Sequence, residues 1–372
     1  MGDLIRLFLK LGFIGFGGPA AAIAMMEDEV VVRRRWLSRE HFLDLVGATN
    51  LIPGPNSTEM ALHIGYERKG YGGLLVAGWC FILPAALMTG VLGWLYMAYG
   101  QVPALEPFLA GIKPAVIVII LGALWRLGKT AVRQVSLVPI GAAVAAALLL
   151  GVNEVLALIG GGLLGLAGLY AWRRRTVIMA LPLIVMGVLQ SGQVEYSLLK
   201  LGLFFLKVGS VLYGSGYVLI AFLDGDLVQT YGWLSEQQLL DAVAIGQFTP
   251  GPVLTTATFI GVMLGGWQGG LVATVAIFLP SFIFVSILNP LIPRLRKSKI
   301  TAAFLDAINV SAVALMLVVT VRLGLAVLTG WSPWIVFGLA ALATWRFRLH
   351  AGWLVAGGAA AGYLLGELSA AF

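Results

Sequence analysis

One segment of this chain occurs twice. Residues 8–55 align without a gap on residues 205–252, and the match continues beyond them once one residue is lost. Identical tripeptides recur at matched positions: Trp36-Leu37-Ser38 and Trp233-Leu234-Ser235, Pro53-Gly54-Pro55 and Pro250-Gly251-Pro252, and Arg126-Leu127-Gly128 and Arg322-Leu323-Gly324. Internal duplication in a membrane chain is typical of secondary transporters.

The composition indicates a membrane protein. Hydrophobic residues make up 60% of the chain and charged residues 11%, whereas soluble domains carry about 25% charged residues. Apolar stretches near the length that crosses a bilayer lie at 72–97, 107–125, 135–152, 154–172, 269–292, 302–321, 333–345 and 350–371. With the glycine-broken stretches 5–26 and 200–223, they predict an all-α polytopic protein of about ten spans.

The path of two segments stays open, and several features are not expected in this chain. Either broken stretch can cross the membrane or dip in and return. Cys80, the only cysteine, falls within a predicted span, so a disulfide and a cysteine-bound metal are not expected. No cofactor is expected. No nucleic-acid partner is expected either, because the net charge of +7 comes from short basic clusters between spans.

The basic clusters predict opposite topologies for the two copies. Loops rich in Lys and Arg face the cytoplasm. Thr230–Gly232 stands where the first copy has Arg33–Arg35, and Arg294–Lys299 stands where the first copy has Tyr99–Glu106, which contains no Lys or Arg. We therefore predict two inverted-topology repeats, with a first repeat at 1–175, a connecting segment at 176–197 and a second repeat at 198–372.

Each copy is predicted to contain a re-entrant helical hairpin broken at Pro-Gly-Pro. In the first copy a helix capped by Ser38 leads to the break, and a second helix runs on through about Gly65 to a loop on the same side. Ser235 and Pro250–Pro252 repeat this arrangement. Such a hairpin can exist at membrane depth only where its open backbone is buried in protein or lines a wet cavity.

The breaks are candidate anion sites. Pro55 and Pro252 suit the first turn of helices that begin inside the membrane, and the free N–H groups of such helix ends attract anions. Two ends brought together by a pseudo-two-fold axis could hold one tetrahedral oxyanion. The expected binding residues are Asn50, Gly54, Asn56, Ser57, Thr58, Gln247, Gly251, Thr255 and Thr256. A tight bend without a binding role is the alternative.

Glycine breaks and intramembrane cations add further binding candidates. Gly17, Gly18, Gly214 and Ser215 expose backbone amides in the broken stretches, although glycine also serves close helix packing. Lys10 and Lys207 occupy matched positions within apolar flanks. An intramembrane lysine is a functional candidate by default, and the alternative is that both side chains extend to an interface.

Five residues are candidates for coupling transport to an ion. Glu59 and His63 share one helix face one turn apart, and histidine can carry a proton near neutral pH. Asp44 and Asp241 match each other in the repeats, and Lys113 lies next to a proline within a predicted span. The second copy has Thr256 and Ile260 in place of Glu59 and His63, so any proton role there is asymmetric.

Five stretches together resemble the long, two-domain form of the chromate ion transporter family. They are FIGFGGPAAAIAMM (13–26), RRRWLSREHFLD (33–44), ATNLIPGPNSTEMALHIGY (48–66), KVGSVLYGSGYVL (207–219) and GQFTPGPVLTTATFIG (246–261). The resemblance implies an inner-membrane carrier that exports chromate, with sulfate as a close analogue and energy from the proton motive force. The family usually places a histidine after Gly-Gly-Pro, where this chain has Ala20, Ala21 and Ala22.

Alternatives to chromate export differ in what they predict. Uptake of sulfate or another oxyanion requires cotransported cations, and a passive channel gives flux that does not saturate. An enzyme would need a convergent cluster of acids, histidines or metal ligands, yet His41, His63 and His350 are scattered. The expected partners are chromate or sulfate, protons and the lipid bilayer, and a homodimer remains open.

Overall fold

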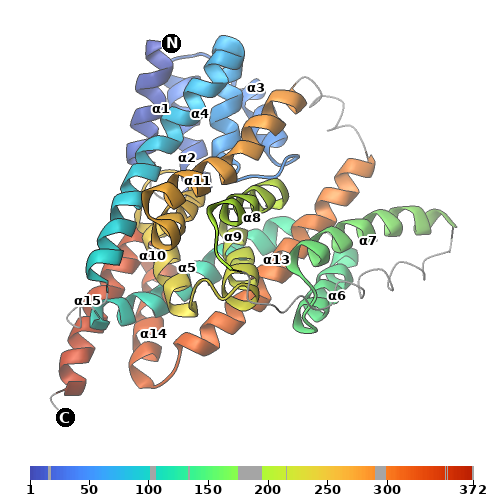
Figure 1. Cartoon of the computed structure of the whole chain (residues 1–372). Coiled ribbons are helices and arrows are strands. Elements are labelled where there is room, and N and C mark those ends of the chain that lie inside the picture. Colours follow the sequence, from blue (N-terminus) through green and yellow to red (C-terminus); the bar gives the residue numbers. More distant parts are fainter. Residues whose placement is uncertain are drawn as a thin grey trace.

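The computed structural model describes residues 1–15, 18–100, 106–132, 135–174, 195–214, 216–289, 299–347, 349 and 351–370, and these residues form helices and their connections (Figure 1). In the first half the elements are α1 (Gly2–Ile14), α2 (Gly18–Glu27), the π-helix η1 (Asp28–Arg33), α3 (Arg39–Thr49), α4 (Ser57–Tyr99), α5 (Glu106–Ala131), η3 (Val135–Leu137), α6 (Val138–Leu149) and α7 (Glu154–Arg174).

The second half repeats the order of the first. Its elements are α8 (Leu198–Val211), η4 (Gly216–Val218), α9 (Leu219–Phe222), the π-helix η5 (Leu223–Thr230), α10 (Glu236–Phe248), η6 (Val253–Thr255), α11 (Thr256–Leu288), α13 (Lys299–Val327), α14 (Trp331–Phe347) and α15 (Ala351–Ala370). Most of the expected connecting segment lies outside the described residues, which resume at residue 195.

The duplication extends to backbone angles. Helix α4 is interrupted at Lys69 (φ −148°) and Gly70 (φ 57°), and α11 is interrupted at Gly265 (φ −143°) and Gly266 (φ 60°). On either side of the first kink, a side chain at Gly65 would collide with the carbonyl of Gly73, so the chain folds back on itself there. Gly261 and Gly269 form the same close contact in α11.

The predicted caps before the Pro-Gly-Pro breaks are confirmed. The Ser38 hydroxyl accepts a hydrogen bond from the His41 backbone N–H at the start of α3. Ser235 begins α10 with a full capping box, in which the side chains and backbones of Ser235 and Gln238 bond reciprocally. Such caps satisfy backbone donors that the first helical turn leaves free. Each cap therefore fixes where the helix leading to a break begins.

The two halves are interlocked. Helix α4 of the first half packs on α11 of the second. Within each half, α1 packs on α4 and α8 packs on α11. Helix α5 packs on α14 and α15 of the second half, and α13 packs in the corresponding way on α6 and α7 of the first (Figure 1). Matched small residues, Gly111 against Gly362 and Ala307 against Gly165, let these helices approach closely.

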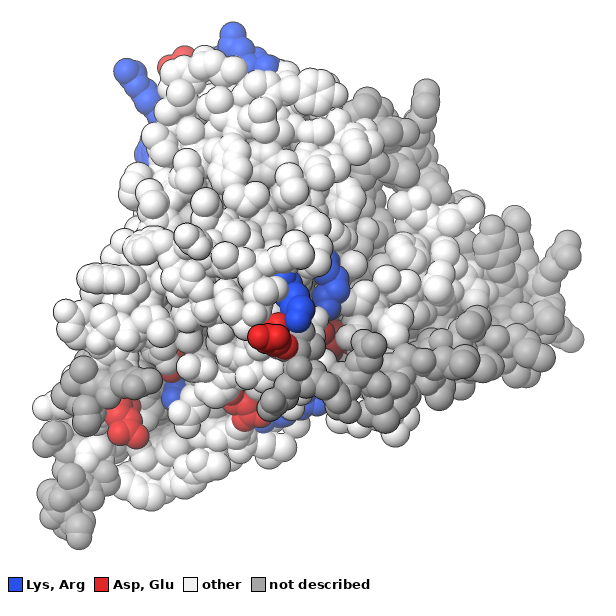
Figure 2. All heavy atoms as spheres, viewed as in Figure 1, with Lys and Arg blue, Asp and Glu red and all other residues white. Residues whose placement is uncertain are grey.

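The described helices include four that are long and apolar enough to cross a membrane, α4, α5, α11 and α13. Shorter apolar helices occur at Val135–Leu149, Glu154–Gly168 and Ala351–Gly366. Large apolar side chains such as Trp345 and Leu150 lie on the surface, 88% and 81% exposed, and much of the face in Figure 2 is uncharged. Apolar surface on this scale suits contact with lipid. The total of about ten spans stays a prediction.

Candidate functional site

Both Pro-Gly-Pro breaks are buried. The first separates α3, which ends at Thr49, from α4, which begins at Ser57 after the N-cap Asn56. The second separates α10 from the short helix η6, whose N-cap is Pro252. Pro55 was expected in the first turn of a helix, but that helix starts two residues later, because Asn56 adopts a positive φ of 57° that is incompatible with helix.

Each break is hydrogen-bonded to the other half of the chain. The backbone N–H of Gly54 donates to the carbonyl of Leu212, 2.8 Å away, and the N–H of Gly251 donates to the carbonyl of Gly15, 3.0 Å away. Gly15 and Leu212 occupy matched positions in the repeats, as do Gly54 and Gly251. Exchanging the repeats thus exchanges the two bonds, which is the reciprocity of a two-fold arrangement.

The surroundings of the two glycines differ. A Cβ at Gly54 would collide with the carboxylate of Glu59 and lie 2.9 Å from the hydroxyl of Ser281. A Cβ at Gly251 would lie 2.6 Å from the methyl group of Ala85. Both glycines also have positive φ, 144° and 90°, a conformation that side chains other than glycine disfavour. Among the described residues, Gly54 of the first break therefore faces a carboxyl and a hydroxyl group, whereas Gly251 of the second faces a methyl group.

Glu59 and His63 contact the second half of the chain through α11. The Ser281 hydroxyl donates a hydrogen bond of 2.5 Å to Glu59 Oε1, and His63 Nδ1 lies 3.0 Å from Oδ1 of Asn289. Glu59 and His63 are both fully buried. Among the described residues neither Glu59 Oε2 nor His63 Nε2 has a hydrogen-bond partner, which is costly for a buried polar atom.

Hydrogen-bond donors near the breaks fall into two groups. The side chains of Thr255, Thr256 and Ser57 donate to carbonyls of their own breaks, and Asn56 donates to Asn50 across 3.3 Å. The buried hydroxyl of Thr58 and the buried Nε2 of Gln247 have no hydrogen-bond partner within the described part of the chain. Thr58 and Gln247 therefore carry buried polar atoms near the breaks whose hydrogen bonds are unsatisfied among the described residues.

The structure describes only part of the glycine-rich interruptions at residues 15–18 and 214–216. Gly17 and Ser215 lie outside the described residues. Gly18 has a φ of 78°, and a Cβ there would lie 3.3 Å from the hydroxyl of Tyr217, which also donates a 3.2 Å hydrogen bond to Gln247. Gly214 has a φ of 95° and lies near Asn309. Residues from both repeats therefore meet at Tyr217, the position that matches Ala20.

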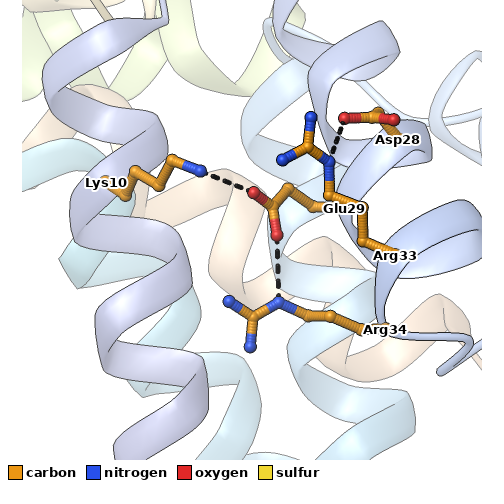
Figure 3. A network of polar contacts seen from close by, with 5 residues as sticks. All are labelled: Lys10, Asp28, Glu29, Arg33 and Arg34. Atoms are coloured by element: carbon orange, nitrogen blue, oxygen red, sulfur yellow. Dashed lines mark hydrogen bonds and ion pairs between the residues drawn. The ribbon is translucent and has the colours of Figure 1, made fainter.

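Lys10 and Lys207 form matched ion pairs, and Figure 3 shows the pair of Lys10. Lys10 Nζ lies 2.6 Å from Glu29, whose other oxygen lies 3.0 Å from Arg34. Lys207 Nζ lies 2.5 Å from Asp226. The hydrogen bond from Lys10, together with Arg34, holds the pKa of Glu29 below its ordinary value of 4.5. Each lysine is thus neutralised by an acid on the π-helix of its own repeat.

Lys113 and Asp241 meet in a cleft of about 740 Å³ between α5, α10 and the end of α13. Their charged atoms are 3.9 Å apart, and the Tyr96 hydroxyl donates a 2.8 Å hydrogen bond to Asp241. Glu106 and Glu236 also line the cleft. Asp44, which matches Asp241, is exposed on α3 instead. The two matched acids therefore lie in different surroundings.

Reasoning from sequence missed the partners of the candidate residues. Glu29 and Asp226 were detectable, because each repeat has an acid 19 residues after its lysine. Ser281 and Asn289 carried no such signal, since the matched positions in the first copy are Ala85 and Gly93. Their role depends on how α4 packs against α11.

Comparison with known proteins identifies similar chains. The family model described as chromate transporter matches residues 2–166 and 199–363. A probable chromate transport protein of Synechococcus elongatus is 31% identical over 352 residues, covering 92% of this chain and 90% of that protein. Chromate transport proteins of Cupriavidus metallidurans and Pseudomonas aeruginosa are 32% and 30% identical, covering 84% and 95% of this chain and 79% and 92% of their own lengths. No solved structure matches.

Proposed function

Because this chain belongs to the chromate transporter family, we propose that it exports chromate from the cytoplasm across the inner membrane by alternating access. Members of this family are transporters and not enzymes. The relatives named as chromate transport proteins match this chain over most of its length. The substrate is then a divalent tetrahedral oxyanion, for which sulfate is a close analogue in charge and shape.

The membrane potential favours export of such an anion. An interior-negative membrane potential pushes negative charge outward, and each charge that crosses releases about 2.3 kcal/mol per 100 mV. A dianion therefore needs little additional driving force. A proton gradient is the alternative source of energy. Uptake of sulfate would instead work against the potential and would require cotransported cations.

The observation that carries the mechanism is the pair of reciprocal hydrogen bonds between the breaks, Gly54 to Leu212 and Gly251 to Gly15. In our proposal the two repeats have opposite topology, and each break gates one side of the membrane. Because each break is bonded to the other repeat, movement of one repeat changes the exposure of both breaks. Opening on one side is thereby tied to closing on the other.

The anion binds between the breaks in this proposal. Thr58 and Gln247 supply side-chain donors that are buried and unpartnered within the described residues, and backbone N–H groups of the breaks supply the rest. Asn50, Asn56, Ser57, Thr255 and Thr256 shape the breaks through their own hydrogen bonds. Lys10 and Lys207, held by their acids, make no direct contact with the anion in this proposal.

The proposal is tested by radiolabelled chromate flux in proteoliposomes, with voltage and pH gradient varied independently and sulfate as competitor. Thr58→Val should lower saturable chromate transport roughly tenfold or more, because a hydrogen bond to a charged group is worth about 1.5–3 kcal/mol. Thr130→Val is the matched control, since Thr130 is an exposed threonine whose hydroxyl donates to its own helix α5.

Three results would contradict the proposal. Unchanged flux in Thr58→Val and Gln247→Leu would reject the binding site. Accumulation of sulfate in right-side-out vesicles, with no export of chromate, would replace export by uptake. Flux that does not saturate and shows no countertransport would replace the carrier by a channel.

A further inference from the structure

The first Pro-Gly-Pro break already holds a carboxyl group of the protein's own. The Glu59 carboxylate lies against Gly54, and its Oε1 accepts the hydrogen bond from Ser281. The backbone N–H groups of Asn56 and of Glu59 itself also interact with this carboxylate. These N–H groups belong to the start of α4, where the free donors and the helix dipole attract negative charge. Glu59 thus occupies the position that an oxyanion would take.

A second observation indicates that this position can also take a ligand. Thr58 is fully buried beside Glu59, and neither its hydroxyl nor Glu59 Oε2 has a hydrogen-bond partner among the described residues. The first turn of α4 therefore carries buried polar atoms whose hydrogen bonds are unsatisfied among the described residues. A tetrahedral oxyanion has four acceptor oxygens and could accept from Thr58 and the backbone N–H groups once the carboxylate is neutral.

The second break lacks these groups. Thr256 stands where the first copy has Glu59, and its hydroxyl is bonded to Val253 in its own break. Ala85, the counterpart of Ser281, faces Gly251. The two breaks therefore share a backbone but differ in charge, and only the first carries an internal carboxylate.

The charges around Glu59 are few. The described groups that interact with its carboxylate are Ser281 from α11 and the backbone of Asn56 and Glu59. His63, one turn further along α4, is the neighbouring titratable group on the same helix face, and it is bonded to Asn289. Among the described residues no cation pairs with Glu59. A second negative charge bound at this break would be repelled by the Glu59 carboxylate, and no cation among the described residues compensates for it.

We propose that Glu59 is a tethered anion that competes with the substrate dianion for the first break, so that the dianion binds there only when Glu59 has taken up a proton. The proton adds to one carboxylate oxygen and leaves a neutral acid, and no other bond is made or broken. Proton and dianion then bind together and are exported together, so the membrane potential supplies the energy for this coupling and an inward proton gradient opposes it. This inference rests on the proposed function and adds its coupling: one outward negative charge is cancelled for each dianion exported.

The test compares Glu59→Gln with wild type in equilibrium binding of radiolabelled chromate to the purified full-length protein, across a pH series. Chromate itself takes up protons in mildly acidic solution, so concentrations are expressed as the dianion. Wild type should bind more weakly as pH rises. Glu59→Gln should bind at a pH-independent affinity, roughly tenfold tighter than wild type at the alkaline end, because a like charge no longer faces the site.

Two further variants keep the test decisive. Ser281→Ala removes the donor that holds the carboxylate, and it should tighten chromate binding by a smaller factor if Glu59→Gln fails to fold. Glu67→Gln is the matched control, an exposed glutamate on the same helix that is paired with His41, and it should behave as wild type.

The outcomes separate this inference from the proposed function. Equal or weaker chromate binding by both Glu59→Gln and Ser281→Ala, with wild-type binding intact, would overturn the tethered anion and leave chromate transport standing. Absence of chromate binding by wild type at every pH would overturn both.

Discussion

Glu29 and Asp226 occupy the same position in the two repeats, and each accepts an ion pair from the lysine that precedes it by 19 residues. The duplicated sequence has kept this pair while most of the neighbouring side chains diverged. The pair joins α1 to η1 in the first repeat and α8 to η5 in the second. The π-helices are therefore anchored to the helices that end at the glycine breaks.

The ion pair of the second repeat should be the more sensitive to mutation. The Asp226 side chain is only 4% exposed, and removing one partner of a buried pair costs about 3–5 kcal/mol because the other charge is left uncompensated. We expect Lys207→Met to lower the thermal midpoint in detergent clearly more than Lys10→Met, since Glu29 keeps Arg34. Adding Asp226→Asn to Lys207→Met should recover most of the loss. Equal effects of the two lysine variants would contradict this reading.

Acid should weaken the first of these contacts. The Glu29 pKa is lowered from 4.5 in the folded protein, so the unfolded state binds the proton more readily. The stability that Glu29 contributes is fully present above pH 4.5 and is lost as pH falls through its lower folded pKa. Thermal unfolding followed over this acidic range should show a steeper decline for wild type than for Glu29→Gln. Parallel curves would argue against the ion pair.

Gly54 should not tolerate alanine. Its φ of 144° disfavours any side chain, and a Cβ would collide with Glu59. Backbone strain of this kind costs about 1–3 kcal/mol, and the displaced carboxylate should also impair transport. Gly168→Ala is the control, because Gly168 lies in helix α7 with no atom close to its Cβ position, and it should be neutral or slightly stabilising. Wild-type flux and stability in Gly54→Ala would show that the break is less constrained than described.

Inverted topology can be tested at two matched sites. Glu40 and Gln237 are equivalent, exposed residues in the first turns of α3 and α10. In a Cys80→Ser background, we expect Glu40→Cys to react with a membrane-impermeant thiol reagent only from the cytoplasmic side and Gln237→Cys only from the opposite side. Reaction of both from one side would mean that the repeats run parallel.

Reasoning from sequence was strongest where one repeat determines its own structure. The duplicated pattern predicted the helix caps at Ser38 and Ser235 and the breaks at Gly54 and Gly251, because these depend on neighbouring residues. It could not identify Ser281 as the partner of Glu59, since their contact spans 222 residues. That contact depends on how one repeat docks on the other, and neither copy contains that information alone.

The position of Pro55 illustrates a smaller limit. Proline suits the first turn of a helix. This preference does not show whether the residue after the proline is itself helical. Asn56, at a positive φ of 57°, delays the helix by two residues. Asparagine is among the residues found most often at positive φ, so its presence was a signal that the proline rule alone overlooked.

The exchange of helices between halves has a consequence for biosynthesis. Helix α5 packs on α14 and α15, which leave the ribosome long after α5 does. Because synthesis proceeds at about 5–20 residues per second, α5 must wait in the bilayer for many seconds before its partners arrive. Truncation near the C-terminus should therefore leave the N-terminal half inserted yet incompletely assembled, and open to degradation.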